Sequence, residues 1–180
     1  MKLHIGCGKR DLGSEWTHYD IRKVDDHIDY IGKAEDLACF HDGTVDEIYA
    51  CHLLEHFGRW EVDQVLKEWC RVLKNGGVLR IAVPDFEAVA QEYGKEHDLE
   101  RLMGLLYGGQ DYEYNYHYTA FDFGSLKKRL EDNGFVGVKR YDWREFLPDG
   151  FDDYSRSYIP HMDFDNGKLM SLNIVAVKDI

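Results

Sequence analysis

Two glycines near the start of the chain and a later carboxylate form the first group of residues that could bind a ligand. Gly6 and Gly8 flank Cys7 and directly follow the apolar run at residues 3–5. Glycines at such a turn leave the backbone amides open, so a ligand can lie against them. Asp20 ends a second apolar run, where a carboxylate can accept hydrogen bonds from both hydroxyls of an adenosine ribose. The combination indicates a nucleoside-binding site more strongly than either part alone.

The spacing of this group distinguishes between two kinds of nucleoside ligand. A dinucleotide-binding fingerprint needs a third glycine, so that a helix can pack closely and direct its N-terminus at a pyrophosphate. Residues 9–12, Lys-Arg-Asp-Leu, occupy that region, and the interval to Asp20 is too short for a full crossover helix. The sequence therefore favours a ligand with one adenosine and no phosphate.

A cluster of histidines supplies candidates for acid–base chemistry. His52 and His56 come after the apolar run at 45–51, and His117 lies in a tyrosine-rich stretch. Imidazole is a natural general base near neutral pH. We take these three as candidate catalytic residues, with Asp85 as an orienting group or alternative base. Ligands of open α/β sheets bind outside the carboxyl ends of the strands, where Asp20, His52 and Asp85 are expected.

The same histidines permit a different chemistry. His52, Glu55 and His56 spell His-x-x-Glu-His, the inverted zinc-peptidase motif in which two histidines one helical turn apart share a metal ion. A zinc hydrolase is therefore an alternative hypothesis, and histidines that only cap and pack are another. The leading hypothesis includes no metal.

Alternating strand-like and helix-like segments must position these groups. Apolar runs predict strands at 3–5, 16–20, 28–31, 45–51, 78–83, 136–141 and 169–177. Helical spacing of apolar residues occurs at 60–73, 86–93, 99–107 and 123–133. We expect Asn75-Gly76-Gly77 to end the first helix, because glycine accepts the left-handed backbone of a C-terminal cap. The pattern predicts an α/β sandwich with a mostly parallel sheet. No clear helix separates the last two strands, which favours an antiparallel pairing there.

Taken in order, these motifs resemble those of the class I S-adenosylmethionine-dependent methyltransferases, in particular a small group whose first motif reads like Leu-x-Ile-Gly-Cys-Gly. The resemblance extends over about residues 2–85 and more loosely beyond. Residues 73–79 resemble the Leu-Lys-Pro-Gly-Gly hairpin before the fifth strand of that family, with Asn75 in place of proline. The resemblance implies a Rossmann-like sandwich with seven strands, helices on both faces and an antiparallel last strand. It also implies S-adenosyl-L-methionine as cofactor.

The resemblance further implies which residues bind that cofactor. The glycine loop would lie along its amino acid and ribose portions, Asp20 would hold the ribose, and the segments at 35–37 and 50–52 would face the adenine amine and the methionine end. The cofactor-binding residues implied in this way are Ile5, Gly6, Cys7, Gly8, Asp20, Ile21, Glu35, Asp36, Leu37, Ala50, Cys51 and His52. His4 and Arg10 stand where the family often has a carboxylate and a third glycine.

Composition limits the class of protein. The 180 residues suffice for one domain, with a cofactor-binding half at 1–85 and an acceptor-binding half at 86–180 that contains irregular segments at 108–119 and 143–167. A net charge of −12 disfavours nucleic acid as a partner, and no apolar run is long enough for a membrane span. The N-terminal residues show no signal-peptide pattern, so we expect a cytoplasmic protein.

The sequence thus predicts transfer of a methyl group from S-adenosyl-L-methionine to an oxygen or nitrogen atom of a small molecule, such as a sugar or another metabolite. Besides the zinc hydrolase, the alternative is a protein that binds the cofactor without catalysis, since sequence alone proves no acceptor base. The sequence does not fix the oligomeric state.

Overall fold

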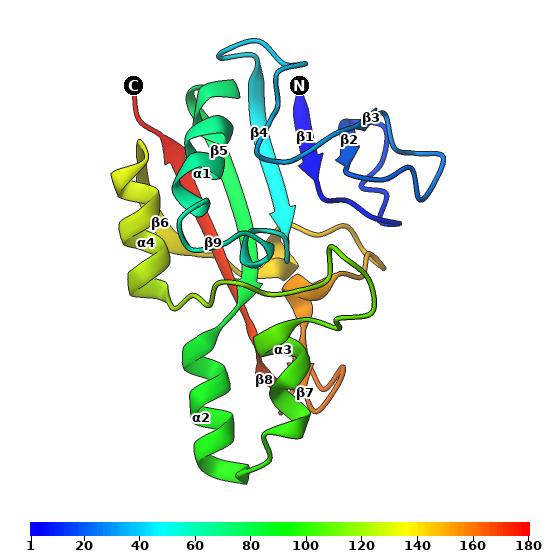
Figure 1. The fold of residues 1–180 in the computed structure, drawn as a ribbon, viewed down its shortest axis with the longest axis vertical. Helices are drawn as coiled ribbons and strands as arrows, with labels where there is room; N and C mark the ends of the chain where they lie inside the picture. The colour runs from blue at the N-terminus through cyan, green and yellow to red at the C-terminus, as the bar shows by residue number, and fades with distance from the viewer.

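The parallel part of the sheet is built around β1. In the computed structural model of residues 1–180, seven strands form one sheet in the order β3-β2-β1-β4-β5-β9-β6 (Figure 1). The parallel strands are β1 (Lys2–Ile5), β2 (Trp16–Asp20), β3 (Tyr30–Ile31), β4 (Val45–Cys51) and β5 (Leu73–Pro84). The last strand, β9 (Ser171–Lys178), is antiparallel to both β5 and β6 (Phe135–Arg140). The predicted fold class is confirmed, including the antiparallel last strand.

Two helices cover one face of this sheet, α1 (Val62–Val72) and α4 (Phe123–Asp132) (Figure 1). In α1, apolar residues recur every three or four positions, so Val65, Leu66 and Trp69 lie on one stripe and are fully buried. They belong to the same core as Ile48 and Ile81 of the central strands. Each such side chain contributes about 2 kcal/mol to folding through its removal from water.

The segment Asn75-Gly76-Gly77 has a different role from the predicted one. The helix α1 ends at Val72, and Leu73 is already extended, with φ −66° and ψ 141°. Leu73 pairs with Val45 and Val78 pairs with Glu47, so the residues between Leu73 and Val78 bulge out of β5. Gly76, with φ +74°, allows the reversal that this bulge requires.

The second face of the sheet corrects another expectation. The resemblance implies helices on both faces, but here the second face is covered by irregular chain with two short turns, η3 (Trp143–Glu145) and η4 (Tyr154–Arg156). The ring of Phe146 packs 4.8 Å from that of Tyr49. The Tyr49 hydroxyl donates a 2.5 Å hydrogen bond to Asp153. Part of the predicted irregular segment at 143–167 is therefore a structural cover of the sheet.

A small lobe lies beyond the carboxyl ends of the central strands (Figure 1). It contains α2 (Phe86–Glu96), η2 (Glu100–Leu102), α3 (Met103–Tyr107) and a short hairpin of β7 (Tyr158–Ile159) and β8 (Lys168–Leu169). Its separate core consists of Ala88, Val89, Leu102 and Met170. No helix in the chain combines the length and the apolar character that a membrane span requires.

Candidate functional site

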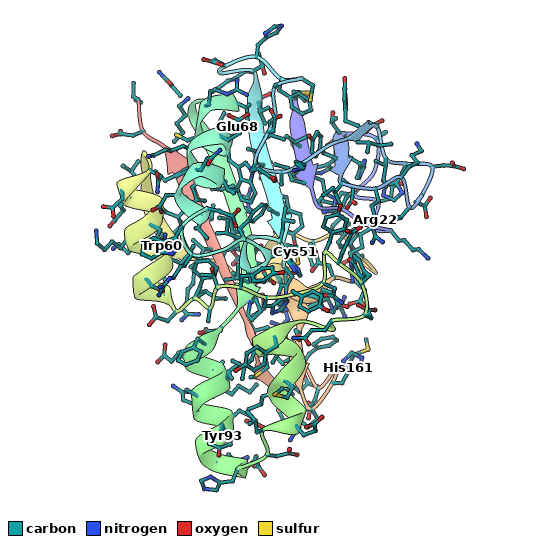
Figure 2. The ribbon with its side chains drawn as sticks, in the orientation of Figure 1. Arg22, Cys51, Trp60, Glu68, Tyr93 and His161 are labelled. Carbon is teal, nitrogen blue, oxygen red and sulfur yellow. The ribbon has the colours of Figure 1, made fainter.

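A cleft of about 540 Å³ opens where β1, β2 and β4 end. This volume is in the usual range for small-molecule sites. Most of the predicted site residues line it, namely Ile5, Gly6, Gly8, Asp20, Ile21, Glu35, Cys51, His52 and His56. The others lie outside the lining, namely Cys7, Asp36, Leu37, Ala50, Asp85 and His117. The carboxyl edge of the sheet is therefore where the predicted groups meet, with Cys51 at its centre (Figure 2).

The glycine loop is held in place by the acidic residue that was paired with it in the sequence. Gly6 and Gly8 both have left-handed backbones, with φ +67° and +56°. The Gly8 amide donates to Asp20 Oδ2 at 2.9 Å, and the Arg22 amide donates to Oδ1 at 3.0 Å. Asp20 is thus fixed at the cleft by two backbone amides, and each oxygen retains a lone pair for a ligand hydroxyl.

Within the glycine loop, the side chain of Cys7 points away from the cleft. Its side chain is fully buried and does not line the cleft. Burial, and then the charge of Asp20, raise the pKa of the Cys7 thiol to about 12. Cys7 therefore packs into the protein as a neutral thiol, and only its backbone can contact a ligand.

His52 stands at the end of β4 with φ +48°, a conformation that costs an L-residue about 1–2 kcal/mol. Its amide donates to Ala82 O at 2.7 Å, and its Nε2 lies 3.1 Å from the Ser171 hydroxyl. Burial, together with the smaller effects of the nearby His117 and His56, lowers the pKa of His52 to about 3. A neutral imidazole with so low a pKa is a weak base, so the geometry suits His52 to positioning.

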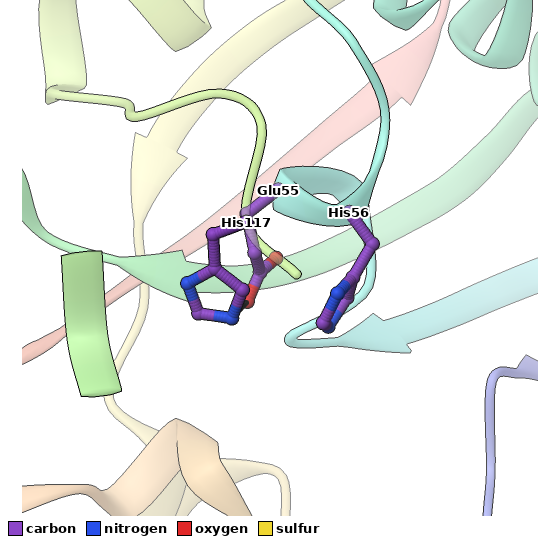
Figure 3. A group of neighbouring side chains, drawn as sticks. All are labelled: Glu55, His56 and His117. Carbon is purple, nitrogen blue, oxygen red and sulfur yellow. Dashed lines mark ion pairs between the residues drawn. The ribbon is translucent and has the colours of Figure 1, made fainter. Parts of the chain in front are cut away.

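Next in the chain, η1 (Leu54–His56) brings a second group of polar side chains to the cleft. His56 Nδ1 lies 3.0 Å from the carbonyl oxygen of Tyr116, and His117 Nδ1 lies 3.0 Å from that of Leu105. A carbonyl oxygen can only accept, so each Nδ1 carries the proton and each Nε2 is unprotonated. The two imidazole rings meet edge to face at 4.8 Å (Figure 3). Burial lowers the pKa of His117 to about 4 and that of His56 below its usual value.

Glu55 lies between these histidines, with only 1% of its surface exposed. His52 Nδ1 is 3.3 Å from its Oε1 and His117 Nε2 is 3.9 Å away, yet neither carboxylate oxygen has a hydrogen-bond partner. Burial raises the pKa of Glu55 to about 8. In the sequence, Glu55 stands out only as part of the zinc-peptidase motif. That motif needs its two histidines on one turn of α-helix, whereas His52 precedes the single 3-10 turn and bonds to Ser171.

The tyrosine-rich segment forms another part of the cleft wall. Its residues 111–115 and Tyr118 line the cleft, and the Tyr118 amide donates to Glu55 O at 2.8 Å. The guanidinium of Arg22 lies 4.2 Å from the ring centre of Tyr112, so this pair links the segment to the end of β2. The segment can be recognised in the sequence, but Arg22 cannot, because its role depends on a contact with a residue far away in the chain.

Asp85 has a structural environment away from the cleft. Its side chain caps α2 by accepting from the Glu87 amide at 3.1 Å, and it pairs with Arg140 Nη1 at 2.9 Å. A role for Asp85 in orienting the acceptor stays a prediction.

Comparison with known proteins shows which proteins this geometry resembles. Residues 3–81 match the model of a methyltransferase domain. A search of curated proteins found no match to the chain. Among solved structures, similar chains include a Thermotoga maritima S-adenosylmethionine-dependent methyltransferase, described as a possible histamine N-methyltransferase (TM-score 0.63, 17% identity, 99% of this chain and 82% of that one). Another is an S-adenosylmethionine-dependent methyltransferase from Archaeoglobus fulgidus (TM-score 0.60, 17% identity, 98% and 85%).

A third similar chain comes from the complex between the Haloferax volcanii Trm112 methyltransferase activator and its methyltransferase (TM-score 0.58, 16% identity, 99% and 82%). Identities this low show a shared fold. Residues 3–81 are therefore similar to a methyltransferase domain, and the chain has the fold of S-adenosylmethionine-dependent methyltransferases.

Proposed function

We propose that the chain transfers a methyl group from S-adenosyl-L-methionine to an oxygen or nitrogen atom of a small molecule, such as a sugar or another metabolite. The observation that carries this proposal is a single cleft in which the glycine loop with Asp20 and the unprotonated imidazole of His56 both take part. The cofactor supplies an electrophilic methyl group on a sulfonium. The protein then has to bind, align and activate the acceptor.

The cofactor half of the cleft fits an adenosyl ligand. Asp20 is fixed with free lone pairs, and a Cβ atom built on Gly8 meets no protein atom within 4 Å, so the loop is open on that side. We assign Asp20 to the ribose hydroxyls, Ile21 and Glu35 to the adenine, and Cys51 to the methionine end. The side chains of Cys7, Leu37 and Ala50 are buried in the protein and do not line the cleft.

The acceptor half of the cleft is assigned to His56 and the tyrosine-rich segment. His56 lines the cleft, and its Nδ1 proton is held by the Tyr116 carbonyl, which leaves Nε2 as the reactive nitrogen. We assign His56 to activation of the acceptor and His52 to positioning. The walls formed by Tyr112, Tyr114 and Tyr118 offer flat surfaces with hydroxyls, which suits a small polar acceptor. We also infer a cytoplasmic location, because all four cysteines are free thiols.

Calorimetric titration with S-adenosyl-L-methionine and its demethylated product tests the cofactor site. We expect the wild-type chain to bind both, and Asp20→Ala to bind at least about tenfold more weakly, since hydrogen bonds to a charged group contribute about 1.5–3 kcal/mol. Asp165→Ala, at an exposed position outside the cleft, is the matched control and should bind like the wild type. No heat from either ligand with the wild-type chain would refute the proposal.

Turnover separates the enzyme from a protein that only binds the cofactor. Labelled methyl transfer is measured with a panel of sugars, phenols and amines. We expect His56→Ala to lose turnover of the accepted compound while it still binds the cofactor. Cofactor binding without transfer to any compound in the panel would favour the non-catalytic alternative.

A further inference from the structure

The side chains of Glu55, His56 and His117 lie close together, yet no hydrogen bond joins them. The carboxylate of Glu55 is buried, and both of its oxygens lack a hydrogen-bond partner. Burial of a carboxylate without a partner is unfavourable, so such a group usually faces a cation or a proton donor. The ligand atoms of all three side chains lie within 4.8 Å of one another (Figure 3).

The imidazole rings of both histidines in this group are held in a fixed orientation. The backbone carbonyls of Tyr116 and Leu105 hold the Nδ1 protons of His56 and His117 at 3.0 Å. In metal sites, a hydrogen bond of this kind fixes the ring orientation and leaves Nε2 as the ligand atom. The residues come from distant parts of the chain, η1 and the tyrosine-rich segment, which the Tyr118 amide ties together through Glu55 O.

We propose that Glu55, His56 and His117 bind one divalent transition-metal ion, with zinc as the best fit. Two imidazoles and a carboxylate are the protein ligands of many zinc sites that keep a fourth position open, with ligand distances of about 2.0–2.2 Å. His117 Nε2 and Glu55 Oε1, now 3.9 Å apart, need only small side-chain rotations to reach a common ion. The His52 imidazole, 3.3 Å from Glu55 Oε1, then orients the carboxylate without itself binding the ion.

The ion would lie next to the cleft, because His56 also lines the cleft. Its open position suits a hydroxyl or thiol, whose pKa falls on metal binding. This consequence rests on the proposed function, and the ion is then the means by which His56 activates the acceptor. The binding site itself does not depend on methyl transfer. The competing account is an uncharged Glu55 that makes a hydrogen bond with His52.

Metal binding is tested on the full chain without any methyl acceptor. Protein stripped with a chelator is titrated with Co²⁺, whose visible absorption reports a site of this kind, and zinc content is measured after dialysis. We expect about one equivalent per chain. Glu55→Gln and His117→Ala should each weaken binding at least about 100-fold, whereas His161→Ala, an exposed histidine, should have no effect.

Cofactor titration of the same variants controls for folding, because neither Glu55 nor His117 lines the cleft. Variants that bind S-adenosyl-L-methionine but not Co²⁺ support the site. Equal Co²⁺ affinity in Glu55→Gln and the wild type, or no ion bound by the wild-type chain, would overturn the metal proposal. Neither result would bear on the methyltransferase proposal, which is tested by cofactor binding and methyl transfer. The metal proposal and the methyltransferase proposal can therefore fail separately.

Discussion

At the scale of single residues, Gly8 combines a conformational and a binding requirement. Its φ is +56°, and no protein atom lies within 4 Å of a Cβ built there. We expect Gly8→Ala to lower the free energy of unfolding by about 1–2 kcal/mol through backbone strain. We also expect it to weaken cofactor binding at least about tenfold, because the methyl group would project into the ligand's space.

Gly43→Ala is the matched control for this prediction. Gly43 has a similar φ of +64° and open space around its Cβ position, but it does not line the cleft. Urea unfolding should show similar losses for both variants, and calorimetry should show weaker binding for Gly8→Ala alone. Equal cofactor affinities in the two variants would argue against our placement of the ligand.

The roles of residues that a backbone turn requires could be predicted from the sequence. The roles of residues that depend on burial could not. In the sequence, Gly6 and Gly8 indicate a tight turn, and Asp20 indicates a carboxylate at a strand end. The structure brings these residues together. Glu55 stands out in the sequence only as part of the zinc-peptidase motif, because its burial and its proximity to His117, which follows far along the chain, are not visible there.

At the scale of elements, the segment at 143–157 acts mainly as a cover for the second face of the sheet. The ring of Phe146 packs at 6.0 Å from those of Trp16 and Tyr141 and at 4.8 Å from that of Tyr49. We expect Phe146→Ala to lower the free energy of unfolding by about 2 kcal/mol, less than for a fully buried phenylalanine because part of the ring is exposed. Cofactor affinity should not change.

Trp60→Ala is the control for that variant, since this side chain is 82% exposed (Figure 2). Its unfolding free energy should stay within about 0.5 kcal/mol of the wild type. Thermal or urea unfolding measures both variants. A strong loss of cofactor affinity in Phe146→Ala, with little loss of stability, would show that the segment serves the ligand more than the sheet.

Elements with a clear apolar period could be predicted, and irregular ones could not. The stripe of α1 and the buried run of β5 are visible in the sequence, and so is the pairing of the last strands. The resemblance implies a hairpin before Val78, but the cover at 143–157 was missed because it depends on contacts with the sheet face. Glycine and aromatic residues alone do not reveal such contacts.

At the scale of the whole molecule, the two faces of the sheet differ in chemistry. One face carries aliphatic residues under α1 and α4, and the other carries His4, His18 and Tyr49 beneath irregular chain. The continuous apolar run at 78–83 is typical of a strand buried on both faces, but the sequence does not show what covers each face. The family resemblance implies helices on both faces of the sheet, whereas in this chain helices cover only one face.

The polar face gives the fold a predictable sensitivity to acid. His4 is 1% exposed with no hydrogen-bond partner for Nδ1, and burial, followed by the charges of His18, Arg10 and His27, holds its pKa well below 6.5. The unfolded chain therefore binds a proton that the folded chain does not, and stability must fall as the pH drops below about 6.5. Above that pH the contribution of His4 to this dependence vanishes.

His4→Leu removes one such group, so its unfolding free energy should fall less steeply on acidification. The difference in slope should approach 1.4 kcal/mol per pH unit, which is about the limit for one proton. Urea unfolding at about pH 7 and pH 5, with a chelator present, measures it, and His41→Leu, at an exposed site, should keep the wild-type slope. Parallel pH profiles for His4→Leu and the wild type would mean that the buried imidazole already carries its proton in the fold.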